Sequence, residues 1–231
     1  MRGKRGQRPE ARGQENDPLA SGLWPLASTR TIGLLGGSFN PAHAGHLHIS
    51  LEAMKRLGLH EIWWLVSPQN PLKAASELAD YATRLASAQS VAGAHPRIRV
   101  LDVEARAGLY YTVDTVRYLT RRHPKTQFVW LMGADNLAGF HRWRRWREIA
   151  SRVAIAVLDR APFSLSALHQ RFAASHAHAR LPAAEARLLA RSPAPAWTYL
   201  AIPRHPLSAS QLRKTLGTAA FLRHSADRSH A

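Results

Sequence analysis

The 231-residue chain contains no cysteine. This absence excludes a disulfide framework, a zinc site with cysteine ligands, an iron–sulfur cluster and a cysteine nucleophile. The chain also lacks any apolar run near the roughly 20 residues that a transmembrane helix requires. Its first 30 residues contain no continuous apolar region of the kind found in secretory signals. We therefore expect a cytoplasmic protein that has no membrane partner.

Acidic residues are scarce, with 15 Asp and Glu against 32 Lys and Arg, and the formal net charge is +17. Such a charge predicts attraction to polyanions, which include nucleic acids, anionic membranes and phosphorylated small molecules. Part of the excess lies in the first twelve residues, and the densest internal cluster is Arg142, Arg144, Arg145 and Arg147. Charge alone does not choose among these ligands.

The chain divides into a flexible basic leader at 1–29, one domain at 30–217 and a short tail at 218–231. Within the domain, short apolar segments alternate with segments of helical periodicity. Strands are expected at 31–35, 62–66, 98–103, 127–132, 153–158 and 197–202. Helices are expected at 47–57, 77–91, 113–122, 143–151, 165–179 and 208–216.

This alternation is typical of βαβ units and predicts an α/β fold, a doubly wound parallel sheet with helices on both faces. In such sheets ligands bind beyond the carboxyl ends of the strands, where the strand order reverses. Functional residues should therefore directly follow predicted strands.

The segment at 36–46, GGSFNPAHAGH, follows the first predicted strand and begins the first helix. Paired glycines let a backbone turn tightly and approach a ligand. The start of a helix offers free N–H groups and a positive dipole end to a phosphate. His43 and His46 lie one turn apart and can face one anion. The segment matches neither the GxGxxG dinucleotide motif nor a P-loop, and a zinc site with His48 would lack a nearby carboxylate.

The same segment resembles the signature of the nucleotidyltransferase superfamily that contains (H/T)xGH. The resemblance implies a Rossmann-like fold and an enzyme that joins a phosphate to the α-phosphate of a nucleoside triphosphate. It also implies that the two histidines contact the triphosphate and stabilise the transition state. The ATP-binding residues expected from this segment are Gly36, Gly37, Ser38, Phe39, His43 and His46.

A second segment, PLSASQLR at 206–213, resembles the superfamily's ISxTxxR signature, with Leu207 and Ser210 as conservative replacements. Ser208 is a favourable N-cap for the last predicted helix. Arg213 could reach triphosphate oxygens with its fork of donors. The resemblance thus adds Ser208 and Ser210 to the ATP site and makes Arg213 the third catalytic residue.

Two further segments, MGADNLAGFHRWRRW at 132–146 and YYTVDT at 110–115, resemble the nicotinate-nucleotide adenylyltransferase branch. The resemblance implies that Asp135 binds a ribose and that Trp143 stacks on the pyridine ring. It also implies that Thr112, supported by Tyr111, meets the nicotinate carboxylate. The loop PQNPLK matches a family loop in which Lys73 would bind the mononucleotide phosphate.

The predicted reaction is transfer of the adenylyl group of ATP to nicotinate mononucleotide, a step of NAD biosynthesis. Mg²⁺ is the expected cofactor, bound mainly through ATP phosphates rather than by a protein metal site. Two alternatives within the superfamily use nicotinamide mononucleotide or pantetheine phosphate. An alternative of another class is a basic nucleic-acid-binding protein using the arginines at 142–147, although no specific nucleic acid is expected. A homo-oligomer is compatible with the sequence.

Overall fold

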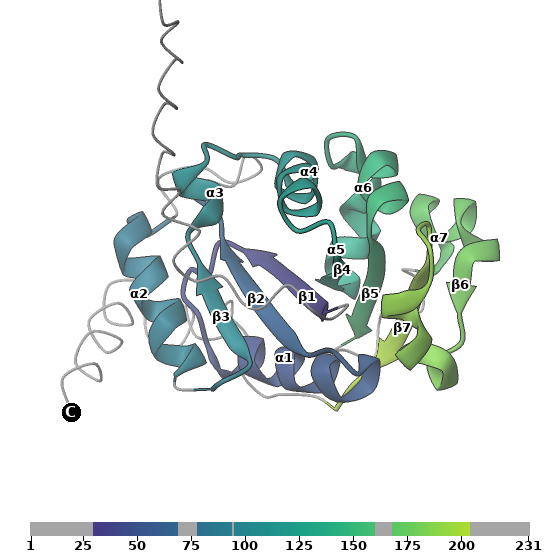
Figure 1. The fold of residues 1–231 in the computed structure, drawn as a ribbon, viewed down its shortest axis with the longest axis horizontal. Coiled ribbons are helices and arrows are strands. Elements are labelled where there is room, and N and C mark those ends of the chain that lie inside the picture. Colours follow the sequence, from purple (N-terminus) through teal and green to yellow (C-terminus); the bar gives the residue numbers. More distant parts are fainter. Residues whose placement is uncertain (1–29, 69–77, 94, 160–167, 204–231) are drawn as a thin grey trace, which may run out of the picture.

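The computed structural model describes residues 30–68, 78–93, 95–159 and 168–203, and seven strands in these ranges form one sheet (Figure 1). All the strand pairs are parallel. The strand order is β3-β2-β1-β4-β5-β7-β6. The strands are β1 (Arg30–Gly37), β2 (Glu61–Val66), β3 (Ile98–Leu101), β4 (Thr126–Gly133), β5 (Ala154–Asp159), β6 (Arg180–Leu181) and β7 (Trp197–Ala201). The doubly wound parallel sheet predicted from the sequence is confirmed.

The strand order reverses between β1 and β4. The chain first builds outward from β1 to β2 and β3, then crosses back so that β4 pairs with the other side of β1. In the β1–β4 register Leu35 lies opposite Leu131, so the two strands end side by side. Their carboxyl ends, Gly37 and Gly133, therefore mark the point where a parallel sheet of this kind opens a ligand crevice.

Helices cover both faces of the sheet, and Figure 1 shows α1 on one side of the strands with α4 and α6 on the other. The α-helices are α1 (Ala44–Leu57), α2 (Tyr81–Ala92), α3 (Val103–Arg106), α4 (Thr112–Arg122), α5 (Ala134–Gly139), α6 (Trp146–Arg152) and α7 (Arg171–Ser175). Short 3₁₀ helices are η3 (Phe140–Arg142), η5 (Ala177–Ala179) and η6 (Ala183–Arg191). Within the described ranges no helix has the length and apolar character needed to cross a membrane.

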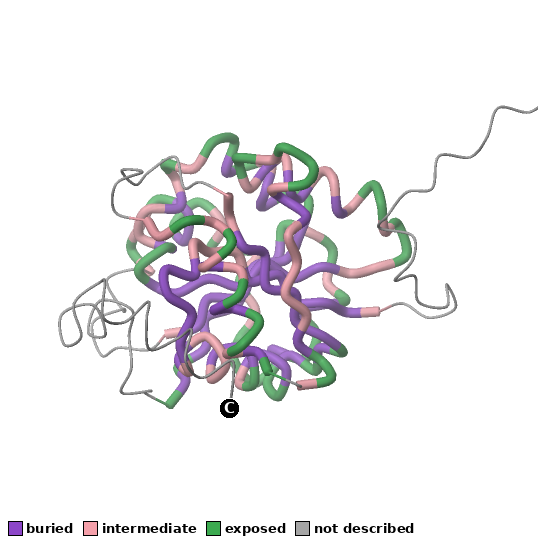
Figure 2. The backbone as a smooth tube through the Cα atoms, turned by 90° about the vertical axis from the view of Figure 1, so that its left-hand side faces the viewer, coloured by how far each residue is buried: buried purple, intermediate pink, exposed green. Residues whose placement is uncertain are grey.

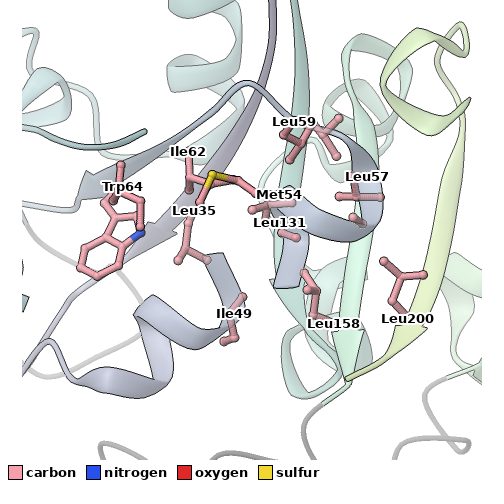
Figure 3. Packing of buried hydrophobic residues seen from close by; sticks show 14 of the residues in the cluster. Leu35, Ile49, Met54, Leu57, Leu59, Ile62, Trp64, Leu131, Leu158 and Leu200 are labelled. Atoms are coloured by element: carbon pink, nitrogen blue, oxygen red, sulfur yellow. The ribbon is translucent and has the colours of Figure 1, made fainter. Parts of the chain in front are cut away.

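Each face of the sheet has its own apolar core because successive strand residues point to opposite sides. Leu34 belongs to the core beneath α4 and α6, whereas Leu35 belongs to the core that α1 covers. Figure 3 shows the second core, where Ile49 and Met54 of α1 face the sheet. All six residues of β2 are buried, and in Figure 2 buried stretches run through the middle of the molecule, whereas buried, intermediate and exposed residues alternate along the outer helices.

Three predicted helices begin later or are shorter than their periodicity suggested. The helix expected at 77–91 begins only at Tyr81, after its N-cap Asp80. The helix expected at 143–151 begins only at Trp146, because Trp143 is extended and Arg145 has a left-handed φ of 52°. The helix expected at 165–179 is α-helical only at Arg171–Ser175 within its described part. There the indole N–H of Trp197 donates to the carbonyl of His176 at 2.7 Å, and Arg180 enters β6.

Candidate active site

The loop between β1 and α1 carries the first sequence motif to the carboxyl edge of the sheet. The N–H of Ser67, just after β2, donates to the carbonyl of Gly37 at 2.9 Å. Phe39 has a left-handed φ of 46°, and its ring stacks 5.2 Å from Trp64 and lies 4.8 Å from His46. This packing holds a backbone conformation that is otherwise unfavourable. The side chain of Phe39 is thus part of the core and is only 2 % exposed.

The two motif histidines cap α1 together. His43 is the N-cap, and its Nδ1 accepts the N–H of Gly45 at 3.0 Å. The N–H of His43 in turn donates to Nδ1 of His46 at 3.2 Å, so each ring satisfies a backbone group of the first turn. The ring centroids lie 4.1 Å apart. The structure therefore brings these two predicted catalytic residues together at one helix start.

This reciprocal capping fixes where each imidazole carries its proton. A ring nitrogen that accepts a hydrogen bond has no proton, so the proton of each neutral ring resides on Nε2. In this tautomer Nε2 is the donor nitrogen of each ring. The first turn of α1 contains no acidic residue that would oppose an anion.

The two glycines of the motif have different physical roles. A Cβ on Gly36 would lie 2.7 and 2.9 Å from two ring carbons of Trp130, so this position must be glycine for the indole to pack. A Cβ on Gly37 would meet Phe39 at an ordinary 3.5 Å. Packing against Trp130 is therefore by itself a sufficient reason for glycine at position 36. Trp130 in turn packs edge-on against Trp143, with 6.2 Å between centroids.

The segment after β4 brings the predicted ribose and pyridine residues to the same edge of the sheet. Asp135 is exposed in the first turn of α5, directly after the strand. Trp143 is half-buried, and its ring makes a T-shaped contact with Phe140, with 5.3 Å between the ring centroids. Trp146, the second tryptophan of the segment, is only 6 % exposed and packs in the core. Trp143 is therefore the tryptophan of this segment with ring surface left for a ligand.

The N-terminus of α4 faces the tryptophan segment. Tyr111 is the N-cap of α4 and Thr112 its first residue. The guanidinium of Arg144 lies 4.5 Å over the ring of Tyr111. Arg117 of α4 also binds both carboxylate oxygens of Glu148 on α6, at 2.7 and 2.6 Å. That hydrogen bonding lowers the pKa of Glu148 to about 2. The structure thus brings Tyr111 and Thr112 towards the segment that holds Trp143.

Glu104 of α3 is a buried carboxyl group beneath α4, and our sequence analysis did not single it out. It is 7 % exposed, and the hydroxyl of Thr115 donates to its Oε1 at 2.7 Å. Burial raises the pKa of Glu104 from 4.5 to about 7, although the bond from Thr115 acts in the opposite direction. No pattern in the sequence distinguishes this glutamate from its exposed counterparts.

Four predicted site residues lie outside the described residues: Lys73, Ser208, Ser210 and Arg213. Over the described ranges, no group of three His, Asp or Glu side chains is arranged to hold a metal ion. The described half of the site therefore consists of the histidine pair, the ends of β1 and β4, and the N-terminus of α4.

Comparison with known proteins gives a consistent result. The model of the cytidylyltransferase-like family matches residues 34–215. A protein of Methylorubrum extorquens named "Probable nicotinate-nucleotide adenylyltransferase" is 52 % identical over 182 residues, which are 79 % of this chain and 98 % of the relative. A Cereibacter sphaeroides protein with the same name is 50 % identical over 184 residues, 80 % of this chain and 96 % of the relative.

Among solved structures, the fold is similar to Plasmodium falciparum nicotinic acid mononucleotide adenylyltransferase complexed with NaAD. The TM-score is 0.61 at 19 % identity, over 81 % of this chain and 84 % of that one. At this identity the likeness concerns the fold.

The close approach at Gly36 yields a prediction about stability. Gly36→Ala should reduce the free energy of unfolding by about 1–3 kcal/mol, because the rigid indole of Trp130 must move. Gly139→Ala is the matched control, since its Cβ would meet only the mobile end of Arg142, at 3.1 Å. Urea unfolding of both variants measures the difference. Equal losses in the two variants would show that Gly36 is not required for packing.

The raised pKa of Glu104 yields a prediction about pH. Between pH 4.5 and about 7 the unfolded chain releases this proton while the folded chain keeps it, so stability falls as pH rises. The decline amounts to about 3 kcal/mol by pH 8. Glu104→Gln should abolish this part of the decline, whereas the exposed Glu185→Gln should retain it. Denaturant titrations at pH 5 and 8 test this, and parallel declines in the wild type and Glu104→Gln would contradict it.

Proposed function

The chain belongs to the cytidylyltransferase-like family and, within it, to the nicotinate-nucleotide adenylyltransferases, and we propose that it transfers the adenylyl group of ATP to nicotinate mononucleotide. The products are nicotinate adenine dinucleotide and pyrophosphate, and the reaction is a step of NAD biosynthesis. The observation that carries the assignment of residues is the histidine pair that caps α1 at the reversal of the strand order. Two Nε2 donors at a helix start suit a chain of phosphates.

The reaction requires positioning and charge stabilisation more than acid–base chemistry. The 5′-phosphate oxygen of the mononucleotide is already anionic, so it attacks the α-phosphorus in line without a general base. The bond from the α-phosphorus to the bridging oxygen breaks, and pyrophosphate leaves. Orientation of two bound reactants can supply about 7–11 kcal/mol. His43 and His46 donate from Nε2 to oxygens that gain charge in the transition state.

Mg²⁺ would neutralise part of the triphosphate charge. The described residues supply no cluster of three carboxylate or imidazole ligands. The ion is therefore expected to take its oxygen ligands from the phosphates and water, which matches its preference for retaining several waters.

The second superfamily segment is proposed to complete the ATP site with Ser208, Ser210 and Arg213. Support comes from the last described residue, Pro203, whose carbonyl lies 2.7 Å from Nε2 of His48 on α1. His48 is two residues after His46. Four extended residues at 204–207 can span up to about 14 Å, and six residues of the expected helix would add about 9 Å, so this proposal requires Arg213 to lie within that distance of Pro203.

The mononucleotide is proposed to bind on the β4 side of the reversal point. Asp135 accepts hydrogen bonds from ribose hydroxyls, and Trp143 stacks on the pyridine ring. Thr112 and the first amides of α4 meet the nicotinate carboxylate, with Tyr111 as support. Lys73 is assigned to the mononucleotide phosphate from the sequence resemblance alone.

The preference for an acid over an amide follows from charge. The start of α4 offers free N–H groups and a positive dipole end. Arg144 adds a full positive charge beside Tyr111. Asp114, the acidic residue of the first turn, is paired with Arg117 at 2.9 Å. A carboxylate on the pyridine ring gains charge-assisted hydrogen bonds here that a neutral amide does not.

The substrate preference is tested by pyrophosphate release with ATP and either mononucleotide. A charge-assisted hydrogen bond contributes about 1.5–3 kcal/mol. We therefore expect kcat/KM for nicotinate mononucleotide to exceed that for nicotinamide mononucleotide at least 10-fold. Arg144→Gln should reduce the ratio of kcat/KM for nicotinate mononucleotide to kcat/KM for nicotinamide mononucleotide. Equal turnover of the two mononucleotides would contradict the nicotinate assignment. If neither mononucleotide gave pyrophosphate with ATP, the assignment of adenylyltransferase activity would be wrong.

The histidine pair is tested by His46→Ala, which should lower kcat by at least about 100-fold through loss of a donor to the transition state. Loss of the cap costs only about 1 kcal/mol, so the variant should remain folded. His95→Ala, which removes an imidazole just before β3 at the opposite edge of the sheet, is the control and should retain wild-type turnover. Wild-type turnover in His46→Ala would remove this residue from the reaction.

A further inference from the structure

Arg84 of α2 is a buried cation whose hydrogen bonds all go to main-chain oxygens, and its guanidinium carbon lies 5.4 Å from the ring centroid of Tyr81. Arg84 is 2 % exposed. Its Nε donates to the carbonyl of Ala79 at 3.0 Å, and Nη1 donates to those of Ser38 and Ser67, both at 2.7 Å. Nη2 donates to the carbonyl of Pro68 at 2.8 Å. One guanidinium therefore satisfies four carbonyl groups.

These carbonyls belong to three segments that meet at the carboxyl edge of the sheet. Ser38 directly follows β1, whereas Ser67 and Pro68 directly follow β2. Ala79 precedes α2, and its N–H donates to Oδ1 of Asn40 at 3.1 Å. The loop that leads from β1 to the histidine pair is thus tied at Ser38 and at Asn40. The first tie leads to Arg84 of α2, and the second leads to Ala79, two residues before the first residue of α2.

The arrangement depends on the shape of the guanidinium as well as its charge. No carboxylate lies within ion-pair distance of Arg84 among the described residues, and Asp80 instead caps α2 through the N–H of Thr83. Burial accordingly lowers the pKa of Arg84. A planar fork can direct donors to several separate acceptors, whereas a lysine ammonium presents its donors from one point.

We propose that Arg84 is a positioning residue for adenylyl transfer, which together with Asn40 clamps the β1–α1 loop and so fixes where His43 and His46 stand. This inference rests on the proposed function. His43 follows Ser38 by five residues, so movement of the clamped carbonyl displaces the N-cap of α1. Displacement of a catalytic group by about 1 Å can cost about 100-fold in rate.

The test compares Arg84→Lys with a matched core variant, Leu119→Ala, in the full chain. Leu119 is buried in the last turn of α4, whereas the predicted mononucleotide residues lie at the first turn, so its truncation should lower stability without moving the loop. We expect Arg84→Lys to lower kcat about 10- to 100-fold and to raise KM for ATP. KM for the mononucleotide should change less, and Leu119→Ala should keep wild-type kinetics below its unfolding transition.

Asn40→Ala keeps the proposal testable if Arg84→Lys does not fold. It removes the Oδ1 acceptor of the second tie and leaves the guanidinium in place, and a smaller fall in kcat is expected. Wild-type kcat and KM in either variant would overturn the clamp, as would an equal kinetic loss in Leu119→Ala. Wild-type protein that forms no dinucleotide would instead overturn the proposed function, so the two failures are distinguishable.

Discussion

The proposed active site depends on the way the first turn of α1 is closed. A helix start leaves backbone N–H groups without partners, and short polar side chains usually satisfy them. Here two imidazoles do so reciprocally, through Nδ1 of His43 and Nδ1 of His46. The capping bonds occupy Nδ1 of each ring, so a neutral ring carries its N–H on Nε2. A structural requirement of the helix thus sets the chemistry that the site offers to a phosphate.

Packing transmits this arrangement across the reversal point of the sheet. On one side the ring of Phe39 packs against both Trp64 and His46, and the guanidinium of Arg84 donates to the carbonyl of Ser38 in the β1–α1 loop. On the other side the missing side chain of Gly36 admits Trp130, and Trp130 supports the edge of Trp143. The proposed ATP side and the proposed pyridine side therefore share one support, the adjacent ends of β1 and β4. Adenylyl transfer requires such support because it relies mainly on orientation.

Much of this organisation follows from the sequence because its signals are local. Short apolar runs between glycines predict buried parallel strands, and the spacing of His43 and His46 predicts adjacent rings at a helix start. The residues missed depend on distant partners. Arg84 is buried because carbonyls 17 and 46 residues away converge on it, and Glu104 is buried by its contact with α4. The late start of α6 reflects the left-handed conformation of Arg145, which periodicity does not reveal.

The most direct test is nitrogen-15 NMR of the side chains of the 13 histidines in the full chain. Spectra of His43→Ala and His46→Ala assign the two resonance pairs. The account predicts that both neutral rings carry their proton on Nε2, with Nδ1 unprotonated, and that ATP with Mg²⁺ shifts both Nε2 resonances. A proton on Nδ1 of either ring, or no response of either ring to ATP, would contradict it.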